Sequence, residues 1–151
     1  MNRSCRGLRI GLGILVAAYA AVNGLLFIPN VTLVRLGVPP LFFPQEPSPF
    51  LKVLTEVPWW QFLLWPIAVG LFAWAAHRLL TGRVALKIYS LALAIDLAFL
   101  AMLKMAGARS GHSGAIDPDY IVAAVMALVV LAIRAAEHRP KAVGDAAHNP
   151  D

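Results

Sequence analysis

Four long apolar stretches constrain this chain more than any other feature. They cover residues 8–28, 59–80, 84–103 and 120–136. Each is close in length to the roughly 20 residues that a helix needs to cross the hydrocarbon core of a bilayer. Helices satisfy their own backbone groups in lipid, so the sequence predicts an all-α integral membrane protein, a four-helix bundle. We expect one transmembrane domain over residues 1–140 and a polar, disordered cytoplasmic tail at 141–151.

The composition excludes several classes of protein. Of the 151 residues, 60% are hydrophobic and only 14% are charged. Soluble domains carry about 25% charged residues, so disorder and an ordinary cytosolic enzyme are both excluded. The single cysteine, Cys5, has no partner for an internal disulfide. This excludes a disulfide-rich scaffold and argues against a membrane thiol–disulfide oxidoreductase, which needs a pair of cysteines.

The basic residues predict an orientation. The chain has 13 Lys and Arg residues against 8 Asp and Glu, a net charge of +5. If the N-terminus is inside, the cytoplasmic segments hold Arg3, Arg6, Arg9, Arg78, Arg83, Lys87, Arg134, Arg139 and Lys141, and the outer segments hold Arg35, Lys52, Lys104 and Arg109. This asymmetry predicts a protein of the cytoplasmic (inner) membrane with both termini in the cytoplasm. We expect the lipid bilayer and its anionic headgroups as partners, and no nucleic acid.

The first apolar stretch has a second interpretation. Three arginines precede it, and Ala18-Tyr19-Ala20 fits the cleavage site of a signal peptide. Cleavage there would leave three spans. The apolar run continues to Ile28, which favours a span that ends at Pro29.

The predicted outer segment, residues 29–58, is rich in proline. Its seven prolines predict that no continuous helix forms there. Its apolar residues favour a segment that lies on the bundle or in the headgroup layer, with a short amphipathic helix over residues 48–56 that places Phe50, Leu51 and Leu54 on one side. Glu46 and Glu56 are candidate acid/base groups for an outer site, although solvated charges are the simpler interpretation.

Other local features concern the spans themselves. Pro66 removes the backbone hydrogen bond to the Phe62 carbonyl and predicts a kink in the second span. Lys104 is expected to end the third span, followed by a mobile loop over residues 105–116. Small residues at helical spacing predict tight helix contacts in three spans. They are Gly13, Ala17 and Ala21 in the first span, Ser90, Ala94 and Ala98 in the third, and Ala123 and Ala127 in the fourth.

Asp96 is the most informative single residue. It lies about 18 Å into the third span at roughly 1.5 Å per residue, near mid-membrane. A carboxylate there costs at least about 2.5 to 3.5 kcal/mol, so it should face the bundle interior or water. Asn23, Gln61 and Tyr19 fall at similar or neighbouring depths and could join it in one polar cluster. Two roles are open for Asp96, a ligand-binding or proton-relay site and a polar clasp between helices.

Motifs for cofactors and metals are absent from the sequence. It has no phosphate-binding loop, dinucleotide fingerprint, zinc-protease motif or nucleophile elbow. His77 and His138 could in principle ligate a haem, but their arginine neighbours favour interfacial solvation. His112, Asp117 and Asp119 match no known cation motif, and Asp117 suits a helix N-cap. We therefore expect no cofactor and no metal.

Three short segments near the N-terminus carry a resemblance to a known family. They are Leu8-Arg9-Ile10-Gly11-Leu12-Gly13, Phe27-Ile28-Pro29 and Leu36-Gly37-Val38-Pro39. Together they resemble the start of the DoxX-like group of small four-helix bacterial membrane proteins. The resemblance implies a shared topology and carries no functional residue over to this chain.

The sequence supports several functions. We expect a non-enzymatic accessory or interaction subunit of a larger membrane complex, or a homo-oligomer, because no catalytic constellation is present. The alternative is a binder or transporter of a proton-linked or lipophilic small molecule in a pocket near Asp96. A third interpretation is a membrane enzyme that uses Asp96, Glu46 or Glu56 on a lipid or quinone.

Overall fold

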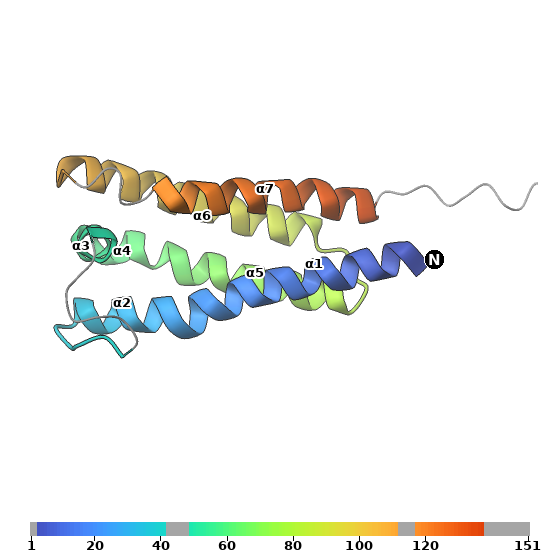
Figure 1. Cartoon of the computed structure of the whole chain (residues 1–151), viewed down its shortest axis with the longest axis horizontal. Coiled ribbons are helices and arrows are strands. Elements are labelled where there is room, and N and C mark those ends of the chain that lie inside the picture. The colour runs from blue at the N-terminus through green and yellow to red at the C-terminus, as the bar shows by residue number, and fades with distance from the viewer. Residues whose placement is uncertain (1–2, 42–48, 112–116, 138–151) are drawn as a thin grey trace, which may run out of the picture.

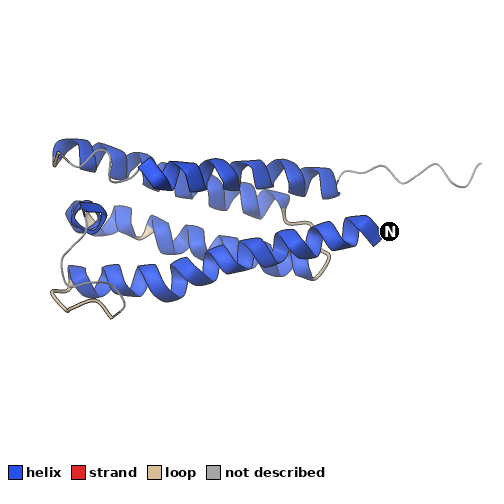
Figure 2. Ribbon diagram, viewed as in Figure 1, coloured by secondary structure: helices blue, strands red, loops and turns tan. Residues whose placement is uncertain are grey.

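Helices joined by short turns make up the part of the protein that the structure describes. The computed structural model describes residues 3–41, 49–111 and 117–137, and within these ranges it contains helices and no strand (Figure 2). Four of the helical stretches are long and apolar enough to cross a membrane: Arg6–Arg35, Trp59–Leu80, Leu86–Arg109 and Pro118–Ala135. The prediction of an all-α chain with four candidate spans is therefore confirmed. Glu46, His112, His138 and the predicted tail at 141–151 lie outside the described residues.

The four spans pack side by side. The first consists of α1 (Arg3–Ala21), the π-helix η1 (Val22–Phe27) and α2 (Ile28–Arg35), and the second of α4 (Trp59–Phe62) and α5 (Leu64–Leu80). The third and fourth are α6 (Leu86–Arg109) and α7 (Asp117–Glu137), and the short α3 (Pro49–Glu56) lies between α2 and α4 in the chain. Helix α1 contacts α5 and α7, and α6 contacts the same two helices. The start of α1 and the end of α7 lie at the same end of the molecule (Figure 1).

The first span does not end at Pro29, so that prediction is wrong. The chain stays helical through α2 to Arg35. In η1 the backbone widens, and the Ile28 N–H donates to the carbonyl of Asn23, five residues back. Pro29 then falls in the first turn of α2, where its missing N–H and fixed φ are tolerated. A π-helical turn thus allows the proline to lie inside a continuous span.

The third span is also longer than predicted. It does not end at Lys104 but continues to Arg109, and the Ser110 N–H bonds to the Ala106 carbonyl at 3.1 Å. Residues 105–109 are therefore helical rather than a mobile loop. Met105 and Ala106 are good helix formers, and together they outweigh the single glycine at position 107.

Helix α3 lies where a short amphipathic helix was expected. It packs on α2 and α6, with Leu51 and Leu54 buried. Arg35, at the end of α2, donates from its guanidinium to the carbonyls of Leu54 and Val57. The same guanidinium lies over the ring of Trp59, 4.3 Å from its centroid. One side chain thus links α2 to both α3 and α4.

Proline and small residues shape the contacts between spans. The second span divides into α4 and α5 at Leu63, which keeps helical backbone angles, and the kink expected from Pro66 stays a prediction. Gly13 contacts α5 so closely that a Cβ there would lie 2.9 Å from the Leu80 side chain. The small residues at helical spacing in the third span differ from Gly13, since Ser90, Ala94 and Ala98 are exposed in the described structure. The prediction of a tight contact within the chain is wrong for them because α6 buries a face of larger side chains, including Tyr89 and Phe99.

Candidate functional site

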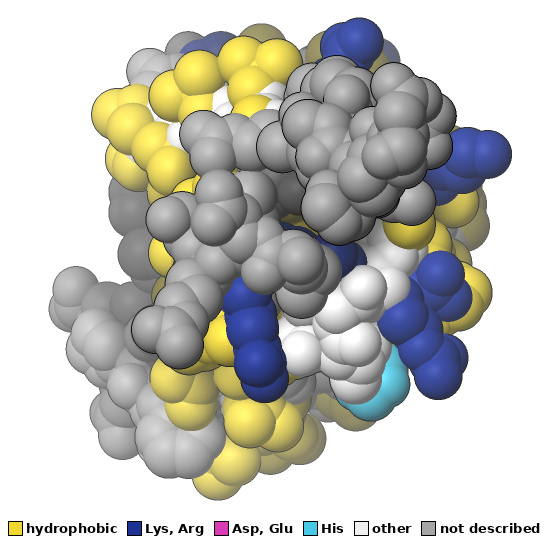
Figure 3. All heavy atoms as spheres, turned by 90° about the vertical axis from the view of Figure 1, so that its right-hand side faces the viewer, with side chains coloured by type: hydrophobic (Ala, Val, Ile, Leu, Met, Phe, Trp, Pro, Cys, Tyr) yellow, Lys and Arg dark blue, Asp and Glu magenta, His cyan; other side chains and the backbone are white. Residues whose placement is uncertain are grey.

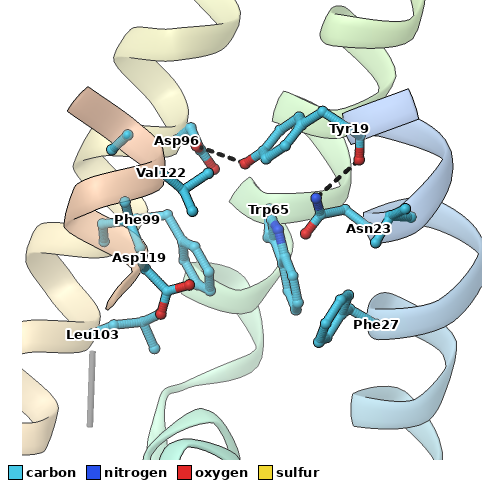
Figure 4. A pocket seen from close by; sticks show the side chains of 12 residues that line it. Tyr19, Asn23, Phe27, Trp65, Asp96, Phe99, Leu103, Asp119 and Val122 are labelled. Carbon is cyan, nitrogen blue, oxygen red and sulfur yellow. Dashed lines mark hydrogen bonds between the residues drawn. The ribbon is translucent and has the colours of Figure 1, made fainter. Parts of the chain in front are cut away.

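A cavity of about 270 Å³ lies among the four spans (Figure 4). Helices α1, α5, α6 and α7 and the π-helix η1 all contribute to its wall. The apolar lining residues are Val22, Phe27, Trp65, Phe99, Leu100, Leu103, Val122 and Ala123, and the polar ones are Tyr19, Asn23, Asp96 and Asp119. An apolar cavity with a few polar groups on its wall is typical of a site for a small molecule.

Asp96 is the most deeply buried polar group of this wall. It is only 4% exposed, and its Oδ2 accepts a hydrogen bond of 3.1 Å from the Tyr19 hydroxyl of α1. The Tyr19 ring packs edge-on against Phe72, with the ring centroids 5.2 Å apart. This packing holds the hydroxyl in place, so Tyr19 orients the carboxyl from across the cavity.

Asn23 lies one helical turn after Tyr19. Its Nδ2 donates to the Tyr19 carbonyl at 2.9 Å, which fixes the amide on its own helix (Figure 4). The structure therefore brings together three of the four residues expected near mid-membrane: Tyr19, Asn23 and Asp96.

Gln61 is not part of this group. It lines a second pocket, of about 250 Å³, together with Glu56 and Arg109. Leu63, between α4 and α5, keeps helical backbone angles, and its N–H bonds to the Trp59 carbonyl at 3.0 Å, so Gln61 still lies one turn before Trp65. Gln61 is the third residue of α4, at the start of its span, whereas Asp96 lies in the middle of α6. Glu56, an outer-segment candidate, therefore shares a pocket with Gln61 rather than with Asp96.

Asp119 is the site residue that the sequence did not assign to the cavity. It was considered only as an outer cation ligand, yet its carboxyl points into the same space as Asp96 (Figure 4). The available signal was its spacing on α7. Asp119, Val122 and Ala123 stand at i, i+3 and i+4, and a residue of that face shares the environment of the buried Ala123.

The aromatic side of the cavity is rigid. The rings of Trp65 and Phe99 stack with centroids 5.8 Å apart and 16° between their planes, which joins α5 to α6. Behind this wall, the hydroxyl of the fully buried Tyr89 donates to the Met126 carbonyl at 2.8 Å and links α6 to α7. The cavity therefore presents aromatic rings and two carboxyl groups in one space.

Comparison with known proteins gives no relative, since no family model, curated protein or solved structure matches the chain. The resemblance to the DoxX-like group stays a prediction from three short segments. Within the described residues, no group of three or more His, Cys, Asp or Glu side chains is placed to hold a metal ion.

Proposed function

We propose that this protein is a multi-pass four-helix bundle of the inner membrane that binds a small lipophilic molecule in the Asp96 cavity. The observation that carries the proposal is the cavity itself, which is lined by the rings of Phe27, Trp65 and Phe99 together with four hydrogen-bonding side chains. Binding sites of this kind use the apolar surface for affinity and the polar groups for orientation.

The position of Asp96 supports the proposal. It lies ten residues into the 24-residue helix α6, about 15 Å along the axis at roughly 1.5 Å per residue. An ionisable side chain in the middle of a span is costly and is by default a candidate functional group. A clasp alone needs a partner but no adjacent space, whereas Asp96 has both Tyr19 and the cavity beside it.

The outer surface supports a membrane location. Large apolar side chains face outward along the spans, with Leu25 72% exposed and Ile121 70% exposed. A soluble monomer rarely exposes so many large apolar residues, while in lipid this surface is covered by acyl chains.

The charge distribution supports the proposed orientation. The end of the molecule where α1 begins shows Lys, Arg and His among its described side chains, and no described Asp or Glu is visible there (Figure 3). A basic end is expected on the cytoplasmic side, which would place both chain ends in the cytoplasm. The same end would attract anionic headgroups.

A second candidate function is that of an accessory subunit or homo-oligomer. The observation that favours it is the exposed small-residue stripe of Ser90, Ala94 and Ala98 on α6. Small residues allow close approach of another transmembrane helix. Under this interpretation, Asp96 and Tyr19 serve as a clasp.

Native mass spectrometry of the protein, transferred from its own membrane into lipid nanodiscs, separates the two candidates. For a ligand-binding protein, we expect the chain to carry a reproducible added mass of a few hundred daltons or less. Asp96→Asn should lower the fraction that carries this mass, because the amide has no charge and its NH₂ group only donates. Glu56→Gln is the matched control, since Glu56 lines the other pocket and should leave the fraction unchanged.

Two results would contradict the proposal. A wild-type chain that never carries a small molecule would leave the cavity without an occupant. A stoichiometric protein partner, with no added small mass, would establish the accessory-subunit function instead.

A further inference from the structure

The charge balance of the cavity indicates which kind of molecule it takes, and this inference rests on the proposed function. Asp96 and Asp119 both line the cavity, from α6 and α7 respectively. None of the twelve lining residues is Lys, Arg or His. The protein thus lines one small space with two acidic side chains and with no basic one.

Two carboxyl groups in one apolar cavity can both be ionised only when a counter-charge is present. Each loses hydration on burial, and the two repel one another more strongly than they would in water. Tyr19 satisfies one oxygen of Asp96 but brings no charge. A bound monocation would offset the repulsion, and it would do so in the low-dielectric region where a charge interaction is strongest.

The aromatic wall fits the same kind of ligand. Trp65 and Phe99 stack on one side, and the Phe27 ring lies beside Trp65 (Figure 4). Aromatic faces attract organic cations and also cover alkyl or aryl groups. A bare metal ion fits less well, because two carboxyls and an amide would have to serve it in a mainly apolar space, and the described residues hold no larger cluster of ligating side chains.

We propose that the ligand of this cavity is a small organic cation, an ammonium group on an apolar alkyl or aryl body. The ammonium lies between Asp96 and Asp119, and the apolar body lies against Trp65 and Phe27. Asp119 is the third residue of α7 and Asp96 is in the middle of α6, so the two carboxyls are at different depths. Asp119 is therefore the group nearer to the membrane surface, and Asp96 is the deeper anchor.

Two probes of nearly equal shape test the proposal. Benzyltrimethylammonium carries a permanent positive charge, and neopentylbenzene is its neutral carbon analogue. Trp65 reports their binding by fluorescence once the three exposed tryptophans are replaced in a Trp59→Phe, Trp60→Phe, Trp74→Phe protein. Titrations are made in nanodiscs, and each affinity is corrected for the partition of the probe into empty nanodiscs.

The expected result is a charge preference that depends on both aspartates. The cation should bind at least tenfold more tightly than its neutral analogue. Asp96→Asn and Asp119→Asn should each remove most of that preference, and neither should weaken binding of the neutral probe more than about twofold. Glu56→Gln is the matched carboxyl-to-amide control, and it should keep the full preference because Glu56 lines the other pocket.

Other outcomes overturn the inference, and they do so separately from the proposed function. Equal binding of the two probes would show that the cavity does not select a cation, while a native ligand seen by mass spectrometry would still support a binding protein. The inference is also refuted if neither probe changes the Trp65 emission. A preference for the cation that survives both aspartate substitutions refutes it as well. If neither aspartate variant folds, the ratio of the two affinities in the parent protein decides alone, since it requires no substitution in the cavity.

Discussion

Removal of the Tyr19 hydroxyl tests whether Tyr19 donates a hydrogen bond to Asp96 across the cavity. Tyr19→Phe keeps the ring, so its edge-on contact with Phe72 at 5.2 Å remains. What it removes is the hydrogen bond of 3.1 Å to Asp96 Oδ2. Asp96 is 4% exposed, so bulk water has little access to replace the lost donor.

The magnitude follows from burial and geometry. Leaving a buried polar group without its partner costs about 1 to 3 kcal/mol. Hydrogen bonds measured between transmembrane helices are weaker, averaging about 0.6 kcal/mol and reaching about 1.7. The oxygen–oxygen distance is at the long end for a hydroxyl donor. We therefore expect Tyr19→Phe to lower the free energy of unfolding by about 1 kcal/mol, within the range for such bonds.

A double-mutant cycle isolates this bond. Asp96→Leu removes the acceptor and leaves an apolar side chain, and in that background Tyr19→Phe should cost close to nothing. Unfolding is followed by circular dichroism during titration of mixed micelles with a denaturing detergent. Tyr120→Phe is the matched control, because the Tyr120 hydroxyl makes only a 3.4 Å contact with the Leu100 carbonyl.

The reasoning fails if the cycle shows no coupling. A coupling energy below about 0.3 kcal/mol is within the usual error of additivity, and it would mean that Tyr19 and Asp96 do not interact. A larger loss in Tyr120→Phe than in Tyr19→Phe would equally contradict the placement of the two hydroxyls.

The remaining predictions concern helix contacts. Gly13→Ala should destabilise the protein by about 1 to 2 kcal/mol relative to Gly11→Ala, because a Cβ at Gly13 meets Leu80 at 2.9 Å while one at Gly11 meets nothing within 4 Å. Thermal unfolding of the two variants checks this, and equal midpoints would count against the α1–α5 contact. Arg35→Met should lower the free energy of unfolding by about 1 to 3 kcal/mol and speed hydrogen exchange in α3, since it removes two bonds from a charged donor. Lys52→Met, at an exposed position of α3, is the control, and the prediction is wrong if both variants exchange alike.

Much of the fold could be predicted because it depends on local composition. A run of apolar residues long enough to cross a bilayer identifies a span without knowledge of its neighbours. The helix boundaries were harder to predict. The span containing Pro29 continues because the preceding backbone widens into a π-helix. No residue pattern in the sequence predicts that change. The charge of Lys104 predicts the end of an apolar span, but helix propensity of the residues after it carries α6 on to Arg109.

The candidate site was only partly predictable for a different reason. Tyr19, Asn23 and Asp96 could be grouped by depth, because rise per residue places side chains along a span. Depth gives no information about rotation. Gln61, the third residue of α4, lines a different pocket together with Glu56 and Arg109. The sequence suggests Asp119 only for an outer cation site, whereas the packing of α7 on α6 brings it to the cavity.

The most direct test of the central claim fills the cavity and leaves its polar groups intact. Ala123 is buried and lines the cavity, while Ala127 lies one turn later on α7 and is exposed. The measurement is the fraction of chains that carry the native small molecule, read by native mass spectrometry for Ala123→Leu and Ala127→Leu. We predict that Ala123→Leu loses the bound molecule and that Ala127→Leu keeps it at the wild-type level. Equal occupancy in the two variants would show that the molecule binds elsewhere and would contradict the assignment of this cavity as the binding site.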